Sequence, residues 1–197
     1  LREDSDLPEV SGRNMNELRS LYDKDVKNKL MQELKLKTAM ACPKPVKIIV
    51  NMGIGVAKDD PKLLASYRDD LKTITGLQPA IRRAKKAEAG FKIRAGEPIG
   101  LVVTLRGERM WGFLQKLIHV VLPRVRDFHG LPRASFDGKG NYNFGLLEHT
   151  VFPEINPNKV DRIKTLGINV TTNAGTDEEG YLLLKFLGWP FAKPKKE

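Results

Sequence analysis

Segments that alternate apolar and polar residues are interleaved with segments of helical spacing along this chain, and their order restricts the possible folds to very few. Every second residue of 46–51 is apolar, as in a strand with one buried face. Leu64, Tyr67, Leu71 and Ile74 instead recur every three or four residues, as on the buried side of a helix. By these criteria we predict strands at 46–51, 78–83, 99–106, 142–146 and 168–172, and helices at 21–36, 61–75, 111–121 and 177–187.

From residue 46 to residue 172 the segments follow the order β-α-β-β-α-β, with an irregular basic excursion before the last strand. This order is typical of a ferredoxin-like α+β fold, the type also found in RNA-recognition motifs. We therefore predict a mostly antiparallel sheet with helices on one face, preceded by an N-terminal helix and carrying extended basic loops. The second face of the sheet would then be left for a ligand.

Residues at the predicted helix ends support these boundaries. Asp60 precedes a proline at the first helical position and is expected to cap the second helix, which Gly76 ends. Thr176 and Glu179 have the spacing of a capping box for the last helix. In the third helix, we expect His119 to be packed against the core.

The chain of 197 residues is long enough for one domain with its own core, which we place at residues 21–192. Residues 1–20 contain three cations and five anions without apolar periodicity, so we interpret them as an N-terminal extension. Residues 193–197 form a charged tail. The extension lacks the hydrophobic run of a secretory signal. Because Leu1 stands where a Met would begin a new chain, we expect a removed leader.

Composition argues against several classes of protein. Cys42 is the only cysteine, so no disulfide can form within the chain, and three widely spaced histidines give no zinc pattern. We expect no metal and no cofactor. No apolar run approaches the roughly 20 residues of a membrane-spanning helix, so no membrane partner is expected.

Polar residues alternate with the apolar positions of the predicted strands and would gather on the uncovered face of the sheet. The members of this set are Asn51, Arg82, Thr104, Arg106 and Asn169, with Gln78 beside them. Such side chains suit the edges and riboses of RNA. The strands offer no exposed pair of aromatic residues for base stacking, so this face is expected to bind through hydrogen bonds and charge.

Half of the formal net charge of +10 comes from residues 82–94, where six cations meet one anion. The cations are Arg82, Arg83, Lys85, Lys86, Lys92 and Arg94. Interspersed Ala and Gly residues are typical of a mobile loop between two strands, and such a loop would present its charges to a nucleic acid. The alternative is an ordinary solvated surface. A second basic stretch, with the same two interpretations, contains Arg124, Arg126, Arg133 and Lys139.

Two acid–histidine pairs leave an enzyme as the alternative function. Asp127 lies near His129, and Glu148 adjoins His149, so either pair could serve acid–base chemistry. Catalysis would also need a converging nucleophile or metal, and the sequence supplies neither. The alternative is therefore a small ferredoxin-like enzyme or ligand-binding domain at Asp127 and His129, whereas structural roles are favoured for both pairs.

Six motifs occur in the order of one known family. They are NMGIG at 51–55, AGFKIRAGEPIG at 89–100, TLRGERMW at 104–111, PRVRDFHGL at 123–131, SFDGKGNYNFG at 135–145 and FPEI at 152–155. Over about residues 22–191 the chain closely resembles the bacterial-type large-subunit ribosomal protein five, the 5S ribosomal RNA-binding family. Taken alone, the glycine motif at 51–55 favours a plain strand-end turn over a phosphate-binding loop, but six ordered motifs are specific and tip this one toward RNA.

The resemblance implies a non-enzymatic protein of the central protuberance that binds 5S ribosomal RNA and other large-subunit RNA. It implies contacts to large-subunit protein eighteen and to small-subunit protein thirteen. Family members contact 5S RNA through the sheet face and the turn after the first strand, which corresponds to Asn51, Met52, Gly53, Thr104 and Arg106. The basic loop at 84–97, with its cations Lys85, Lys86, Lys92 and Arg94, would lie near P-site transfer RNA. The second basic stretch would face the small subunit and nearby RNA.

Two positions depart from the family pattern. Leu77 follows Gly76 where the family has glutamine, and Gln78 is displaced by one residue, which reverses its face in a strand. Arg82 stands where the family has threonine and would replace a hydroxyl hydrogen bond with a phosphate contact. The length and acidity of the extension favour an organellar ribosome, chloroplast over mitochondrion, with a bacterial cytoplasm as the alternative.

Overall fold

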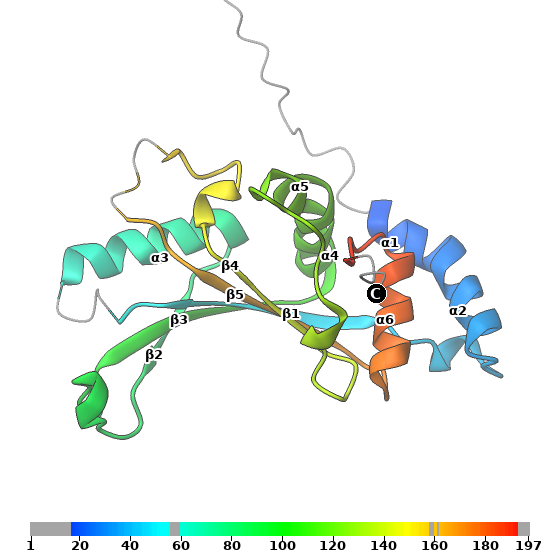
Figure 1. Cartoon of the computed structure of the whole chain (residues 1–197), viewed down its shortest axis with the longest axis horizontal. Coiled ribbons are helices and arrows are strands. Elements are labelled where there is room, and N and C mark those ends of the chain that lie inside the picture. Colours follow the sequence, from blue (N-terminus) through cyan, green and yellow to red (C-terminus); the bar gives the residue numbers. More distant parts are fainter. Residues whose placement is uncertain (1–16, 56–59, 158–159, 161, 193–197) are drawn as a thin grey trace, which may run out of the picture.

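A five-stranded sheet with the order β2-β3-β1-β5-β4 forms the centre of the computed structural model, which describes residues 17–55, 60–157, 160 and 162–192 (Figure 1). Every neighbouring pair of strands is antiparallel. The strands are β1 (Pro45–Gly53), β2 (Ala80–Arg83), β3 (Pro98–Leu105), β4 (Tyr142–Leu146) and β5 (Leu166–Thr172). The predicted extension at 1–16 and the tail at 193–197 lie outside the described residues.

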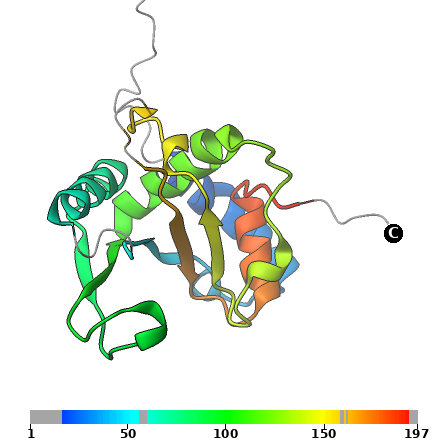
Figure 2. The same ribbon diagram turned by 60° about the vertical axis from the view of Figure 1, so that its left-hand side comes forward.

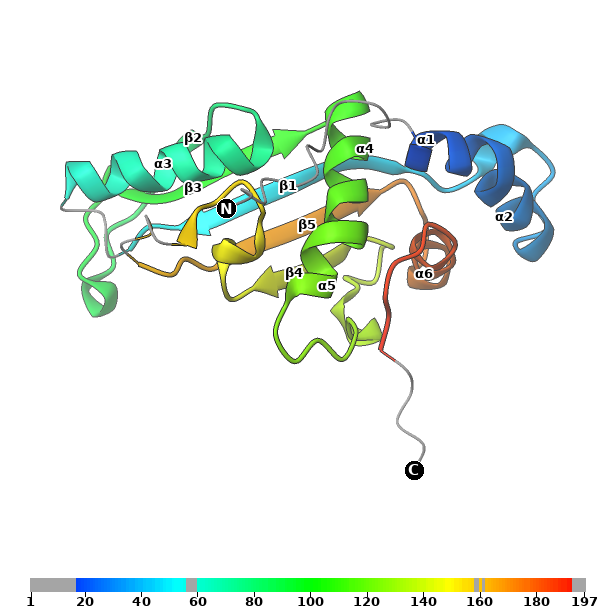
Figure 3. The ribbon, with the colours of Figure 1, turned by 90° about the horizontal axis from the view of Figure 1, so that it is seen from above.

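Helices cover one face of this sheet. Figure 1 shows α3 and α4 on the same side of the strands, and in Figure 3 α3 runs along β3 while α4 crosses the sheet. The helices are α1 (Glu17–Leu21), α2 (Lys27–Glu33), α3 (Pro61–Thr75), α4 (Gly107–Lys116), α5 (Leu122–Arg124) and α6 (Asp177–Phe186). Together, β1, α3, β2, β3, α4 and β5 form the predicted β-α-β-β-α-β unit, and β4 extends it beside β5. The predicted α+β fold is confirmed.

Short helical turns complete the described chain. Two of them, η1 (Tyr22–Val26) and η4 (Leu117–Val121), are wider than an α-helix and continue α1 into α2 and α4 into α5. The others are η2 (Ala39–Ala41), η3 (Ala89–Phe91), η5 (Arg133–Ser135) and η6 (His149–Val151). Within the described residues, no helix has the length and apolar character needed to cross a membrane.

Burial alternates along the strands as the sequence predicts. In β1, Ile48 and Val50 are fully buried and Met52 is 1 % exposed, whereas Asn51 is exposed on the other face. Successive side chains of a strand point to opposite faces, so the helices pack on the first set. Burial of this face removes apolar area from water, and each large side chain contributes about 1.5–3 kcal/mol.

The first helix begins four residues earlier than predicted. Glu17 is its first residue, and Leu18, within the expected extension, is only 3 % exposed. Tyr22 anchors the next turn, because its ring lies 5.5 Å from that of Trp111 and its hydroxyl donates to the carbonyl of Pro43 over 2.9 Å. Leu18 lies between two charged residues and belongs to no apolar repeat in the sequence, so its burial comes from tertiary packing.

Helix caps follow the predictions closely. The Asp60 carboxylate accepts hydrogen bonds from the backbone of Lys62 and Leu63, and Gly76 ends α3 with φ 67°. Thr176 caps α6 by accepting from the backbone N–H of Glu179. The Glu179 carboxylate accepts from the backbone N–H of Gly175 at 2.8 Å rather than from that of Thr176, so the capping box is shifted by one residue.

Two expectations for the third helix are wrong. His119 is exposed, because the wide turn η4 buries Leu117, Ile118 and Val121 instead. The predicted end of this helix at residue 121 is also too early, because α5 continues it through Pro123 to Arg124.

Candidate nucleic-acid interface

The uncovered face of the sheet carries three members of the predicted polar set, Asn51, Thr104 and Asn169. In one row across the sheet, Thr104 of β3 is paired with Ile49 of β1, which is paired with Asn169 of β5. In the next row Asn51 lies between Val102 and Gly167. Residues paired directly across antiparallel strands share a face, so Asn51, Thr104 and Asn169 lie together. We call this surface the open face.

Half-buried apolar residues lie between these polar groups. Ile49 and Val102, at the centre of the open face, are both partly exposed. They give the face an apolar floor on which a ribose or a base edge could rest. The sequence predicted only the hydrophilic members of this surface, because Ile49 lies in an apolar triplet that masks the alternation.

The carboxamide of Asn51 is available to a ligand. Asn51 is exposed, and its side chain takes part in no hydrogen bond with any residue of the described chain. It can therefore offer both a donor and an acceptor. Thr104, half-buried on the neighbouring strand, likewise leaves its hydroxyl unused among the described residues.

Amides on β4 and β5 are already partly occupied. Asn169 donates from Nδ2 to Oδ1 of Asn143, and its own Oδ1 accepts from the Thr171 hydroxyl at 2.9 Å. This small network holds the Asn169 carboxamide in one orientation. Asn143 and Thr171 were not in the predicted set, although their positions in alternating strands place them on the same face.

Two predicted arginines flank the open face. Arg82 of β2 is paired with Gly100 and is exposed at one edge of the sheet. Arg106 follows β3 in extended conformation, with φ −140° and ψ 164°, so the alternation of faces continues as far as this residue. Both arginines are exposed, so a ligand on the face could reach them at its margins.

Two members of the predicted set lie elsewhere. The Met52 side chain is 1 % exposed and faces the helices, so only its backbone lies near the turn at the end of β1. Gln78 does not join the open face, because its amide oxygen accepts hydrogen bonds from the guanidinium of Arg68 on α3. Leu77, beside it, packs against the core. Gly53 is exposed and paired with Gly100.

Residues 84–97, which we call the basic hairpin, join β2 to β3 and project away from the sheet (Figure 2). The sequence predicted a mobile loop, but backbone hydrogen bonds extend the ladder into it. Ala84 donates to the carbonyl of Glu97 at 2.8 Å, and Glu88 and Ile93 exchange a pair of hydrogen bonds. Lys85, Lys86, Lys92 and Arg94 are all exposed along this hairpin.

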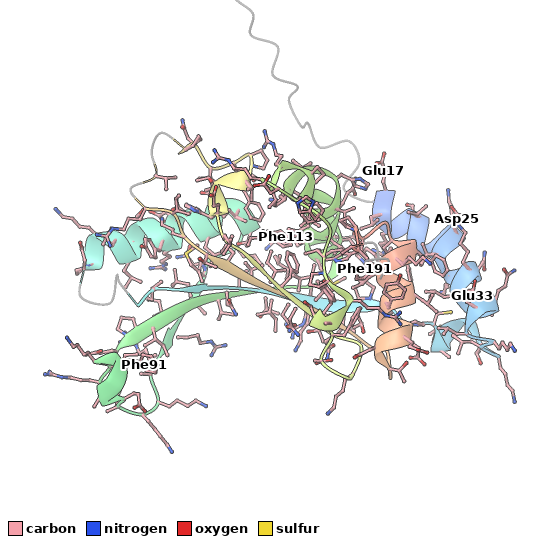
Figure 4. The ribbon with its side chains drawn as sticks, viewed as in Figure 1. Glu17, Asp25, Glu33, Phe91, Phe113 and Phe191 are labelled. Atoms are coloured by element: carbon pink, nitrogen blue, oxygen red, sulfur yellow. The ribbon has the colours of Figure 1, made fainter. Side chains whose placement is uncertain are left out.

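Phe91 is a surface residue that the sequence analysis missed. Its side chain is 78 % exposed and projects from the basic hairpin, as Figure 4 shows. Lys92 follows it with φ 51°, a left-handed conformation that makes the turn. An aromatic ring among cations can stack on a base or ribose, and its position within the basic segment 82–94 was the available signal.

The second basic stretch is exposed at all four predicted positions, Arg124, Arg126, Arg133 and Lys139. Arg133 has a structural partner, because its guanidinium carbon lies 4.4 Å from the centre of the Tyr181 ring. Lys139 lies in a tight turn organised by the Asp137 carboxylate, which accepts from the backbone of Lys139 and Asn141. The side-chain Nδ2 of Asn141 also donates to this carboxylate at 2.7 Å, and this hydrogen bond, more than the backbone ones, lowers the pKa of Asp137.

The acid–histidine pairs form no catalytic constellation. Asp127 and His129 are both exposed, and within the described residues no group of three His, Cys, Asp or Glu side chains could hold a metal ion. His149 is fully buried and accepts at Nδ1 from the backbone N–H of Lys164 at 3.2 Å. Its role is structural, as favoured above.

Comparisons with known proteins agree with the motifs in the sequence. The profile described as ribosomal protein L5 matches residues 39–94, and the profile for the C-terminus of the same ribosomal family matches residues 98–191. The large ribosomal subunit protein uL5 of Fusobacterium nucleatum is 55 % identical over 172 residues, which cover 87 % of this chain and 94 % of the relative. The chain belongs to the ribosomal protein L5 family.

Other L5 proteins align over nearly their whole length. Those of Halothermothrix orenii and Thermoanaerobacter sp. are 51 % and 50 % identical, over 90 % and 91 % of this chain and 99 % and 100 % of theirs. As an L5 protein, the chain is a structural component of the large ribosomal subunit and not an enzyme. These relatives are bacterial, so the expectation of an organellar ribosome finds no support in them, whereas the bacterial alternative fits.

Proposed function

We propose that this L5 protein binds 5S ribosomal RNA in the central protuberance of a bacterial large subunit, through its open face and the turn that follows β1. The observation that supports this most is that neither the carboxamide of Asn51 nor the hydroxyl of Thr104 makes a hydrogen bond within the described residues, on a face that helices leave uncovered. These groups can bond base edges and 2′-hydroxyls, while Arg82 and Arg106 meet phosphates.

The other basic surfaces have separate partners in this proposal. The basic hairpin, with its exposed lysines, projects away from the sheet, and in this proposal it lies near P-site transfer RNA while the open face holds 5S RNA. Arg124, Arg126, Arg133 and Lys139 lie on a different segment and face other large-subunit RNA and the small-subunit head. Protein eighteen of the large subunit and protein thirteen of the small subunit are the proposed protein neighbours.

Retention of labelled 5S ribosomal RNA on the protein, measured across a series of salt concentrations, tests the proposal. We expect tight binding that weakens as salt rises, because phosphate contacts release counterions, and a clear preference over transfer RNA. Asn51→Ala and Thr104→Ala each remove hydrogen bonds worth about 1–3 kcal/mol and should weaken 5S binding about 5- to 150-fold.

Lys85→Ala is the matched control, since it removes a cation from the basic hairpin and leaves the open face intact. It should bind 5S RNA nearly as the wild type does. Equal affinity for 5S and transfer RNA, or a large loss in Lys85→Ala with none in Asn51→Ala, would contradict the proposal.

A further inference from the structure

Asn51 lies over a residue that has no side chain. Gly167 of β5 is paired directly with Asn51 of β1 on the open face. A Cβ atom at Gly167 would overlap Oδ1 of Asn51, and it would lie 3.0 Å from its Cγ and 3.2 Å from its Nδ2. The carboxamide therefore occupies the space that any other residue at this position would fill, and it extends across β5 rather than toward β3.

The fold itself does not require a glycine at this position. Gly167 is the second residue of β5, is paired with a neighbouring strand on each side, and lacks the positive φ that favours glycine. The three atoms nearest to its missing Cβ all belong to the Asn51 side chain, so no backbone atom approaches more closely. A glycine inside a strand is normally unfavourable, because it has more freedom to lose and no side chain to pack. We therefore attribute the glycine at this position to the Asn51 side chain beside it and not to the backbone.

We propose that Gly167 is a positioning residue for the Asn51 carboxamide, and that the missing side chain is what allows Asn51 to lie flat on β5 and present its amide to RNA. This inference rests on the proposed function of the open face. A methyl group at position 167 would force Asn51 into another rotamer, at little cost to the fold, since the displaced atoms are the end of an exposed side chain. Affinity for 5S RNA would fall while stability would not.

Gly145 supplies a matched control on the next strand. It is paired with Gly167 in the same row of the open face, and a Cβ there would meet only the carbonyl of Leu166, at 3.9 Å. Gly145→Ala therefore adds the same methyl group beside the same surface without touching Asn51. Both substitutions replace a strand glycine, so their effects on the unfolded chain should match.

The experiment compares 5S RNA affinity and thermal midpoint for Gly167→Ala, Gly145→Ala, Asn51→Ala and the Gly167→Ala/Asn51→Ala double variant. We expect Gly167→Ala to bind about tenfold more weakly and Gly145→Ala to bind within about twofold of the wild type. The double variant should bind no more weakly than Asn51→Ala alone, because the carboxamide to be displaced is gone. The side-chain amide signal of Asn51 in NMR spectra of the free protein should shift in Gly167→Ala and stay in place in Gly145→Ala.

Each other outcome has a definite meaning. If Asn51→Ala binds 5S RNA normally, the proposed function of the open face fails. If Asn51→Ala weakens binding but Gly167→Ala does not, the positioning role alone is overturned. Equal losses in both glycine variants, or additive losses in the double variant, would show that the methyl group obstructs RNA directly. A lowered thermal midpoint confined to Gly167→Ala would show that the fold needs this glycine, which also overturns the inference.

Discussion

An asparagine on the open face can serve RNA only to the extent that the protein leaves its amide unused. Asn51 makes no side-chain hydrogen bond with the described residues, whereas Asn169 is held by Asn143 and Thr171. Amides that are already hydrogen-bonded within the protein lose less conformational entropy when RNA binds, but they offer fewer free donors to the RNA. At the scale of single residues, Asn51 is therefore suited to reading RNA, and Asn169 is suited to shaping the surface around it.

His149 is a buried titratable residue that should make stability depend on pH. It is fully buried between Asp70 of α3, whose Oδ2 lies 3.6 Å from Nε2, and Lys164, whose ammonium group contacts the same carboxylate. The Lys164 ammonium group also donates to the Ser66 hydroxyl at 3.4 Å and lies 4.2 Å from the centre of the Tyr67 ring, both on α3. Burial, and then the positive charge of Lys164, lower the pKa of His149, and Asp70 only partly opposes them.

The unfolded chain therefore takes up a proton on His149 before the folded protein does. Full stability is expected above the unfolded pKa of about 6.5, and it should fall toward lower pH by at most about 1.4 kcal/mol per pH unit. Urea unfolding at pH about 7.5 and about 5.5 measures this loss. In His149→Gln, which keeps an acceptor for the Lys164 N–H, the loss should shrink by about 1 kcal/mol. Substitution of the exposed His129 is the control. If His149→Gln lost as much stability between the two pH values as the wild type does, the assignment of the pH dependence to His149 would be contradicted.

At the scale of elements, α6 is held in place by a close backbone contact. Helix propensity alone would predict the wrong effect for an alanine at this contact. A Cβ at Gly180 would lie 2.6 Å from the carbonyl oxygen of Gly140 and 2.9 Å from its Cα, in the turn before β4. Asp177, in the first turn of α6, accepts hydrogen bonds from the backbone of Gly138 and Gly140. The helix and the turn consequently pack with no side chain between them.

Gly180→Ala should therefore destabilise the protein, although alanine is favoured over glycine by about 1 kcal/mol in an exposed helix. We expect a loss of about 1–3 kcal/mol in the free energy of unfolding, since backbone cannot move aside as a side chain can. Gly175→Ala, whose added Cβ would meet only the flexible Glu179 carboxylate at 3.7 Å, serves as the control. Denaturant unfolding of both variants decides this, and a stabilised Gly180→Ala would refute the argument.

The sequence predicted those elements whose residues carry a local signal. Alternation located β1 and β3, and Asp60 and Thr176 located helix starts, because caps and strand faces depend on neighbouring residues. It missed what depends on packing: the burial of Leu18, the exposure of His119 and the pairing of Gln78 with Arg68. For the open face, the sequence predicted several of the polar residues and the side of the sheet on which they lie. The space over Gly167 could be found only from the pairing of β1 with β5 in the structure.

At the scale of the whole molecule, the fold separates two polar surfaces. The sheet presents hydrogen-bonding groups on a rigid face, and the basic hairpin carries a cluster of cations outward from its edge. Directional hydrogen bonds distinguish one RNA from another, whereas exposed cations attract any polyanion. Affinity and preference should thus be separable by substitution at different places in the structure.

Replacing Lys85, Lys86 and Arg94 by glutamine tests this separation. The formal net charge falls from +10 to +7, and Lys92 is kept because its left-handed backbone forms the turn. Binding to bulk RNA should weaken, and the slope of log affinity against log salt should decrease by about 2–3, since each phosphate contact contributes about 0.7–0.9. The preference for 5S over transfer RNA should persist or increase, whereas in Asn51→Ala the preference should fall with the slope unchanged. If the triple variant lost its preference for 5S RNA while keeping the wild-type salt slope, the proposed division of roles between the open face and the basic hairpin would be wrong.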